Sequence, residues 1–179
     1  EMARMVAGLL LAPGMDDPTL DRLYYRLQFE TAPIVEQNES PETYLALIDG
    51  FGRYLEQRLD RAPTDLTFVR DYGTYLGRRG RTLRDLWAFD EAFRSLESSA
   101  RVFRRLAMHD PDTGSRWEDL FVSLHELRLL FDRVRDIPTA SAYARQSWEV
   151  LCHMRNEGFE IAPQLAHVLE QLDGMYGLR

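Results

Sequence analysis

Lysine is absent from this 179-residue chain, in which all 22 basic residues are arginine. A P-loop needs a lysine on the nucleotide phosphates, a Schiff-base enzyme needs a lysine amine, and a protein kinase needs an ion-paired lysine. The sequence therefore excludes all three classes of protein.

Cysteine and long apolar runs are also scarce. Cys152 is the only cysteine, so the chain cannot form an internal disulfide, which slightly favours a reducing compartment. Its helical neighbours predict a buried thiol. The longest apolar run, around residues 6–12, is far too short to span a bilayer, so we expect no membrane insertion.

The remaining composition is that of an ordinary globular protein, with 45% apolar and 28% charged residues. Its length predicts a single domain, residues 1–179, that folds without a metal or a disulfide. The formal net charge of −7 argues against RNA as a partner, because domains that track nucleic-acid phosphates are usually basic.

Helical periodicity follows the whole chain without strand-like alternation, so we expect an all-α fold of about eight helices. Short breakers separate the helices, and neighbours should therefore pack as antiparallel hairpins. Four of the expected helices cover residues 3–11, 65–79, 83–108 and 120–135. The other four begin at Pro18, Pro41, Thr139 and Pro163. Their expected caps are Asp17, Ser40, Thr64, Thr82 and Thr139, with a capping box at Ser115 and Glu118.

The pattern is clearest from Tyr143 to Pro163. Trp148, Leu151 and Met154 share one stripe of this helix and are expected in the core, Gly158 ends it, and a proline follows. Other aromatic residues also recur on one helix face and are expected in the core, namely Tyr24, Tyr25, Phe29, Trp87, Phe89, Phe93, Trp117, Phe121 and Phe131. Gly50 and Gly52, inside a helical pattern, predict a close approach of two helices.

Residues 42–53 and 65–91 contain similar pieces, and with residues 143–163 they resemble pentatricopeptide repeats. In that family each unit of about 35 residues is a pair of antiparallel helices with a Thr-Tyr start, a Gly-Arg turn and a Met…Gly…Pro exit. The resemblance implies a right-handed, solenoid-like stack of degenerate repeats. It also implies a non-catalytic subunit that binds another protein within a larger assembly.

RNA-reading members of that family commonly carry a polar base-reading residue after the tyrosine of the first helix. The matching residues are Leu45 after Tyr44 and Val69 after Phe68. Apolar side chains cannot hydrogen-bond a base edge, so the resemblance favours a protein partner over RNA.

Within this class, the acidic charge and degenerate repeats make the chain similar to the additional subunit that euglenozoan ATP synthases attach to the α subunit of their catalytic head. This implies a protein of the mitochondrial matrix that binds the ATP synthase α subunit, with no cofactor and no small-molecule substrate. Two alternatives stay open: an RNA-binding pentatricopeptide protein, and a stressosome-type sensor domain of a regulator in the bacterial cytoplasm. The second rests on the resemblance of residues 76–79 and 83–87 to such domains.

Catalytic and metal-binding motifs are not found. His125-Glu126 lacks the second histidine of a zinc-protease helix. Cys152 and His153 are adjacent, so on a helix their side chains point about 100° apart and cannot easily hold one ion. We therefore expect no enzyme, no cofactor and no metal.

One arginine cluster is a candidate partner-binding site. Arg78, Arg79 and Arg81 fall where the pattern predicts a turn between two helices. Guanidinium groups pair well with carboxylates, so we predict that this turn contacts acidic residues of a partner protein. A solvated turn should also tolerate glutamine at all three positions with little change in stability.

Overall fold

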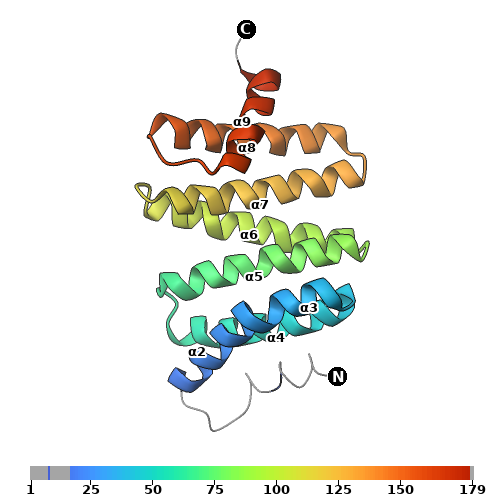
Figure 1. Cartoon of the computed structure of the whole chain (residues 1–179), viewed down its shortest axis with the longest axis vertical. Coiled ribbons are helices and arrows are strands. Elements are labelled where there is room, and N and C mark those ends of the chain that lie inside the picture. Colours follow the sequence, from blue (N-terminus) through green and yellow to red (C-terminus); the bar gives the residue numbers. More distant parts are fainter. Residues whose placement is uncertain (1–7, 9–16, 178–179) are drawn as a thin grey trace. The chain divides into compact units, whose positions relative to one another are not determined.

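The structure, a computed structural model, describes Gly8 and residues 17–177. Nearly all of these residues are helical and no strand occurs among them, which confirms the all-α prediction (Figure 1). They form seven continuous helices rather than eight. The expected first helix, residues 3–11, lies outside the described residues except for Gly8.

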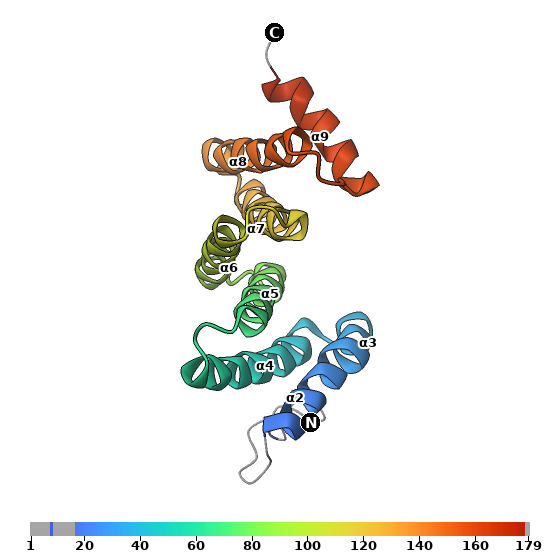
Figure 2. The ribbon, with the colours of Figure 1, turned by 90° about the vertical axis from the view of Figure 1, so that its left-hand side faces the viewer.

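Packing divides the chain into two compact units, the first ending at Ser95 and the second beginning at Leu96. The first unit contains α2 (Asp17–Arg26), the π-helical turn η1 (Leu27–Thr31), α3 (Ala32–Asn38), α4 (Pro41–Arg61), α5 (Leu66–Asp85) and the start of α6 (Phe89–His109). The second contains the rest of α6, α7 (Gly114–Arg133), α8 (Ile137–Asn156) and α9 (Pro163–Tyr176). Segments α2, η1 and α3 follow one another without a break. Within the units, α4 packs on α5 and α7 packs on α8, and each pair runs antiparallel (Figure 1). Figure 2 shows the same helices turned by 90°.

Helix starts follow capping chemistry, although the capping residue is not always the expected one. Ser40 caps α4 as predicted, and its hydroxyl accepts a hydrogen bond from the Thr43 N–H. Aspartates cap two other helices. Asp65 caps α5 in place of Thr64, and Asp136 caps α8 in place of Thr139. An aspartate accepts bonds from the free N–H groups of the first turn as a threonine would.

The expected capping box at the start of α7 is wrong. The helix begins at Gly114, which places Ser115 inside the first turn, and Thr113 takes the cap position. The Thr113 hydroxyl donates to the Asp110 carboxylate at 2.7 Å and makes no side-chain cap bond to the helix.

The expected break between residues 79 and 83 is also wrong, because α5 continues to Asp85. Thr82 is buried inside this helix, and its hydroxyl donates to the Arg78 carbonyl oxygen at 3.0 Å. A threonine can satisfy its hydroxyl on the carbonyl four residues earlier, so it need not cap a new helix. Helix α6 therefore starts at Phe89 instead of Leu83.

Three helices end in the same backbone motif. At the end of α5, the Ala88 N–H donates to the Leu83 carbonyl and the Trp87 N–H to the Arg84 carbonyl, which is a Schellman motif. Helices α7 and α8 repeat these two bonds. The left-handed residue is Trp87 (φ 63°), Arg135 (φ 61°) or Gly158 (φ 74°). The glycine stop predicted for α8 is confirmed.

Each unit has its own core. The largest fully buried side chains of the first unit are Tyr24, Leu47, Ile48, Tyr54 and Leu55, and those of the second are Leu96, Leu124, Leu127, Leu130, Leu151 and Met154. The prediction for Leu151 and Met154 is confirmed. Trp148 is only partly buried, and its indole N–H donates to the Asp173 carboxylate of α9 at 2.7 Å. Cys152 is partly exposed, so the predicted buried thiol is wrong.

Two of the aromatic residues expected in the core are exposed. Phe29 is 67% exposed because it lies in η1, where the wider π-helical turn shifts the side chains relative to a 3.6-residue period. Trp87 is 65% exposed because it lies in the α5–α6 connection and not on a helix face.

The close approach predicted at Gly52 is confirmed, because a Cβ atom there would overlap the Tyr75 ring of α5. Gly52→Ala should therefore lower the free energy of unfolding by about 1–3 kcal/mol, as overpacking does. Gly174→Ala in α9 is the control. Nothing lies within 4 Å of its added Cβ, and we expect an unchanged or slightly higher stability. Urea denaturation of the three proteins measures both effects, and equal effects of the two substitutions would contradict the account.

Candidate functional site

Three tyrosines of the first unit that are buried or partly buried, Tyr24, Tyr54 and Tyr75, are paired with aspartates, and each aspartate also faces an arginine. The Tyr54 hydroxyl donates to the Asp21 carboxylate, which forms an ion pair with Arg58 at 3.2 Å. This pairing joins α2 to α4 through polar groups that lie beside the apolar core.

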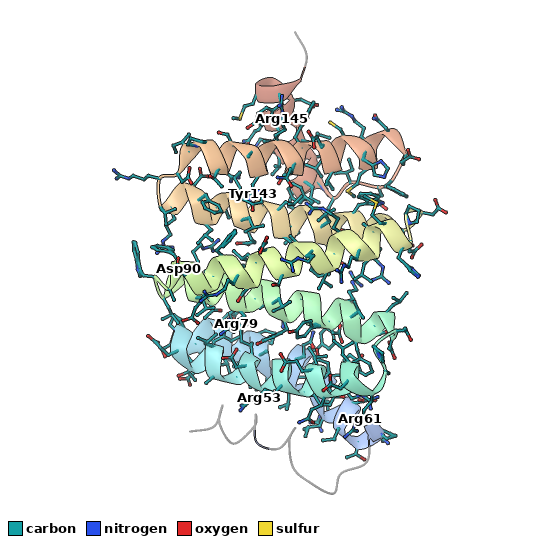
Figure 3. All side chains as sticks on the ribbon, turned by 180° about the vertical axis from the view of Figure 1, so that it is seen from behind. Arg53, Arg61, Arg79, Asp90, Tyr143 and Arg145 are labelled. Atoms are coloured by element: carbon teal, nitrogen blue, oxygen red, sulfur yellow. The ribbon has the colours of Figure 1, made fainter. Side chains whose placement is uncertain are left out.

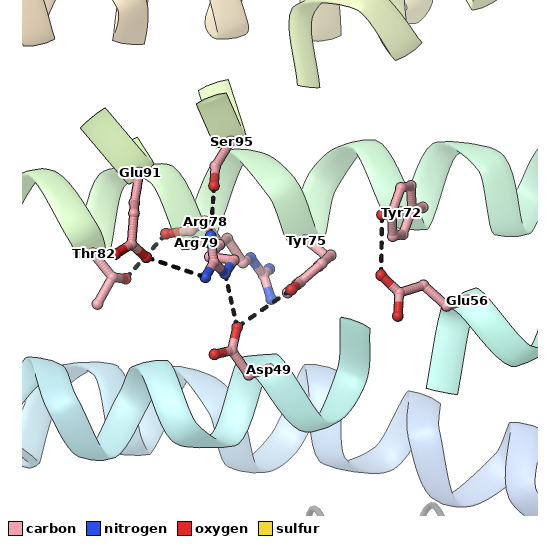
Figure 4. A network of polar contacts seen from close by, with 9 residues as sticks. All are labelled: Asp49, Glu56, Tyr72, Tyr75, Arg78, Arg79, Thr82, Glu91 and Ser95. Carbon is pink, nitrogen blue, oxygen red and sulfur yellow. Dashed lines mark hydrogen bonds and ion pairs between the residues drawn. The ribbon is translucent and has the colours of Figure 1, made fainter. Parts of the chain in front are cut away.

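The second pairing links α4, α5 and the start of α6 (Figure 4). Asp49 accepts from the Tyr75 hydroxyl at 3.3 Å and from Arg79 Nε at 3.0 Å. Arg79 also donates from Nη1 to the buried Ser95 hydroxyl at 2.8 Å, and its Nη2 lies 3.6 Å from the Glu91 carboxylate. One guanidinium of α5 therefore holds side chains from two other helices, α4 and α6.

The third pairing surrounds Asp71 of α5. The Tyr25 and Tyr24 hydroxyls hydrogen-bond this carboxylate, and Arg70 and Arg78 act on it through their charges. Burial nevertheless raises the pKa of Asp71 above its ordinary value, because desolvation outweighs these four stabilising neighbours. Asp71 Oδ2 is buried without a hydrogen-bond partner among the residues that the structure describes.

Burial also raises the pKa of three tyrosines, Tyr24, Tyr54 and Tyr75, well above the ordinary range. Neighbouring carboxylates add to this effect, since a negative charge disfavours a phenolate. The neutral hydroxyl is also the form that can donate to an aspartate. The raised pKa values and the hydrogen bonds therefore favour the same protonation state.

A small cavity opens beside Asp71. Its lining residues come from α2, η1, α4 and α5 and are Tyr24, Gln28, Ile48, Phe51, Asp71, Thr74, Tyr75 and Arg78. Gln28 is 6% exposed, and its Oε1 atom is buried without a hydrogen-bond partner among the described residues. We take this cavity and the surrounding tyrosine–aspartate pairs as the candidate functional site.

The predicted arginine cluster lies in this region, but not in a turn. Arg78, Arg79 and Arg81 occupy the middle of α5. Arg78 lines the cavity and Arg79 binds Asp49. Burial raises the pKa of Tyr44, and the charges of Arg78 and Arg81 partly offset this increase. The expected solvated turn is wrong, and a contact of the cluster with a partner protein stays a prediction.

Sequence reasoning missed Gln28 and Asp71, the two acceptors of the cavity. No local pattern marked Asp71, because its partners Tyr24 and Tyr25 lie in another helix. No pattern marked Gln28 either, because its burial depends on the π-helical turn.

In the second unit, an aspartate holds the last helix. Asp173 of α9 accepts from the Trp148 indole and from Arg155 Nη1, both at 2.7 Å. The Trp148 hydrogen bond, followed by the bond and charge of Arg155, lowers the pKa of this carboxyl. This contact accounts for the partial burial of Trp148.

Among the described residues, no three histidine, cysteine or acidic side chains are grouped so that they could hold a metal ion. In the same part of the chain, no helix is long and apolar enough to cross a membrane. Comparisons of the chain with protein-family models, with curated proteins and with solved structures find no match. The function must therefore be argued from the chain's own geometry.

Arg79→Gln should lower the free energy of unfolding by about 1–3 kcal/mol, because it removes both ion pairs and leaves the buried Ser95 hydroxyl without its donor. This reverses the expectation that the arginine cluster tolerates glutamine. Urea denaturation measures the loss, with the exposed Arg53 as the matched control (Figure 3). Arg53→Gln should cost less than about 0.5 kcal/mol. A loss of the same size in both variants would mean that the Asp49 network adds nothing.

Asp71 should make stability depend on pH. Its pKa is higher in the folded chain than in the unfolded chain, so folding favours the neutral acid. The stability of the parent relative to Asp71→Asn should therefore fall as pH rises from the ordinary pKa through the raised one, and then level off. Urea denaturation of both proteins over a pH series tests this, with Asp60→Asn at an exposed position as control. A parent-to-variant difference that stays constant or grows with pH would be incompatible with a raised pKa.

Proposed function

We propose that the chain is a non-catalytic helical subunit that binds another protein through the connections between its helices. The observation that carries this proposal is Trp87. This residue is 65% exposed, has a left-handed backbone and sits in the α5–α6 connection.

The left-handed backbone at this position disfavours a tryptophan. A bulky residue with a left-handed backbone costs roughly 1–2 kcal/mol relative to glycine. Gly158 occupies the equivalent position at the end of α8 without that cost. The Trp87 ring packs edge-on against Phe89, with 5.5 Å between ring centroids, and most of its surface faces solvent. Exposed tryptophans of this kind are enriched among residues that dominate protein–protein binding energies.

Charges beside Trp87 indicate the chemistry of the partner. Asp85 and Asp90 are exposed on either side of the connection, and Asp90 begins α6 with Glu91 (Figure 3). Arg84 already pairs with Asp85 and Arg79 with Glu91, so Asp90 is the acid that would pair with a basic residue beside an apolar pocket that takes the indole. The proposed partner surface is therefore apolar at its centre and basic at its rim.

The second unit offers a similar connection between α7 and α8. Arg135 has the left-handed backbone there, and it is flanked by Val134 at 41% and Ile137 at 58% exposure. Each unit thus exposes large apolar side chains at a helix connection with the same backbone motif. This recurrence supports helix connections as contact sites.

A narrower proposal names the partner as the α subunit of a mitochondrial ATP synthase. It is supported by the resemblance in repeat type and by the acidic charge. Native purification of the tagged chain, followed by mass spectrometry, distinguishes the alternatives. Recovery of ATP synthase subunits supports the narrower proposal, whereas recovery of RNA favours an RNA-binding protein and recovery of bacterial regulators favours a sensor domain.

Trp87→Gly separates binding from folding. The substitution should leave the free energy of unfolding unchanged or raise it by about 1 kcal/mol, because glycine accepts the left-handed backbone. It should weaken the complex with the co-purified protein at least about tenfold, as loss of a central aromatic contact does. Titration calorimetry with that protein measures the second effect. Arg53→Gln is the control, since it changes an exposed side chain of α4 outside the helix connections, and it should leave the affinity unchanged. Parent-like affinity of Trp87→Gly would refute the role of the indole.

A further inference from the structure

Gln28 is turned inward by the only π-helical segment among the described helices. Such turns are rare, have poorer backbone hydrogen bonding than an α-helix and are frequent at functional sites. Within η1, the polar Gln28 is 6% exposed, whereas the next residue, Phe29, is 67% exposed. The usual preference for burying the aromatic residue is reversed at this turn. The π-helical turn therefore places an amide in the cavity.

Two acceptors line that cavity without a protein donor. Gln28 Oε1 comes from η1 and Asp71 Oδ2 comes from α5, and both atoms are buried and unpaired among the described residues. Each buried acceptor without a donor carries a desolvation penalty, which an occupant able to donate hydrogen bonds would remove.

Charge and size restrict the occupant. The Asp71 charge is offset by the guanidinium groups of Arg70 and Arg78, of which Arg78 also lines the cavity, so a cation gains no net attraction. An anion would face two buried acceptor atoms. Both unpaired atoms are acceptors, and the occupant must therefore supply two hydrogens. The cavity is narrow and has room for a sphere of water size. A neutral molecule with two hydrogens and these dimensions is water.

We propose that the cavity binds one ordered water molecule, which donates hydrogen bonds to Gln28 Oε1 and Asp71 Oδ2. Buried waters usually make about three hydrogen bonds, and Arg78 is a lining residue that can donate the third. The water completes the polar cluster around Asp71 and ties the π-helical turn to α5. It is a fixed part of the site and independent of any protein partner.

Magnetic relaxation dispersion of water nuclei counts the long-lived waters of the folded protein. Gln28→Met keeps the length of the side chain but removes the amide, so the count should fall by one relative to the parent. Gln57→Met in α4 is the control, because Gln57 is exposed and does not line the cavity. It should leave the count unchanged. An equal count in the parent and in folded Gln28→Met would overturn the proposal.

A second measurement uses the parent protein alone and does not depend on the folding of a variant. Cross-relaxation in NMR between a long-lived water and the Gln28 side-chain amide supports the proposal. Its absence, together with slow exchange of those amide hydrogens, would show a direct bond from a reversed Gln28 amide to Asp71 and overturn it. A bound N–H signal in ¹⁵N-ammonium chloride would overturn it too, by showing ammonium in place of water.

Discussion

Hydrogen bonds from buried tyrosine hydroxyls to aspartates are the interaction on which the first unit depends. A phenol contributes a large apolar ring to a core, but its hydroxyl must find a partner once it leaves water. Asp21 supplies that partner for Tyr54, and Asp49 does so for Tyr75. The carboxylates in turn require a positive charge nearby, because a buried anion without one is costly. The aromatic core, the acids and the arginines are therefore selected together.

This constraint explains why the arginines of α5 point inward. Arg79 is held by Asp49, Glu91 and Ser95, and Arg78 balances Asp71. An arginine committed in this way has little capacity left for a partner. The features that suit recognition are instead exposed apolar side chains at helix connections, among which Trp87 is the largest. The acidic surface charge and the inward arginines are thus two results of one arrangement.

Much of the helical architecture was predictable from local rules, and the failures have identifiable causes. The Ser40 cap and the Gly158 stop depend on one residue and its immediate neighbours, so the sequence specifies them. The end of α5 could not be predicted in this way, because Thr82 satisfies its hydroxyl within the helix and does not cap a new one. The π-helical turn shifts the helical period at Gln28, and no motif in the sequence announces it. The site was missed for the same reason, since it needs that turn and contacts between distant helices.

A spectrophotometric titration of the tyrosines tests the central claim most directly. The neutral form of Tyr24, Tyr54 and Tyr75 is favoured by folding, so their contribution to stability is present below the pKa of an unfolded tyrosine and is lost as pH rises above it. The account predicts that these three hydroxyls ionise only when circular dichroism shows that the helices unfold at alkaline pH. Ionisation of all eight tyrosines near the ordinary pKa of about 10, with the helices intact, would contradict it.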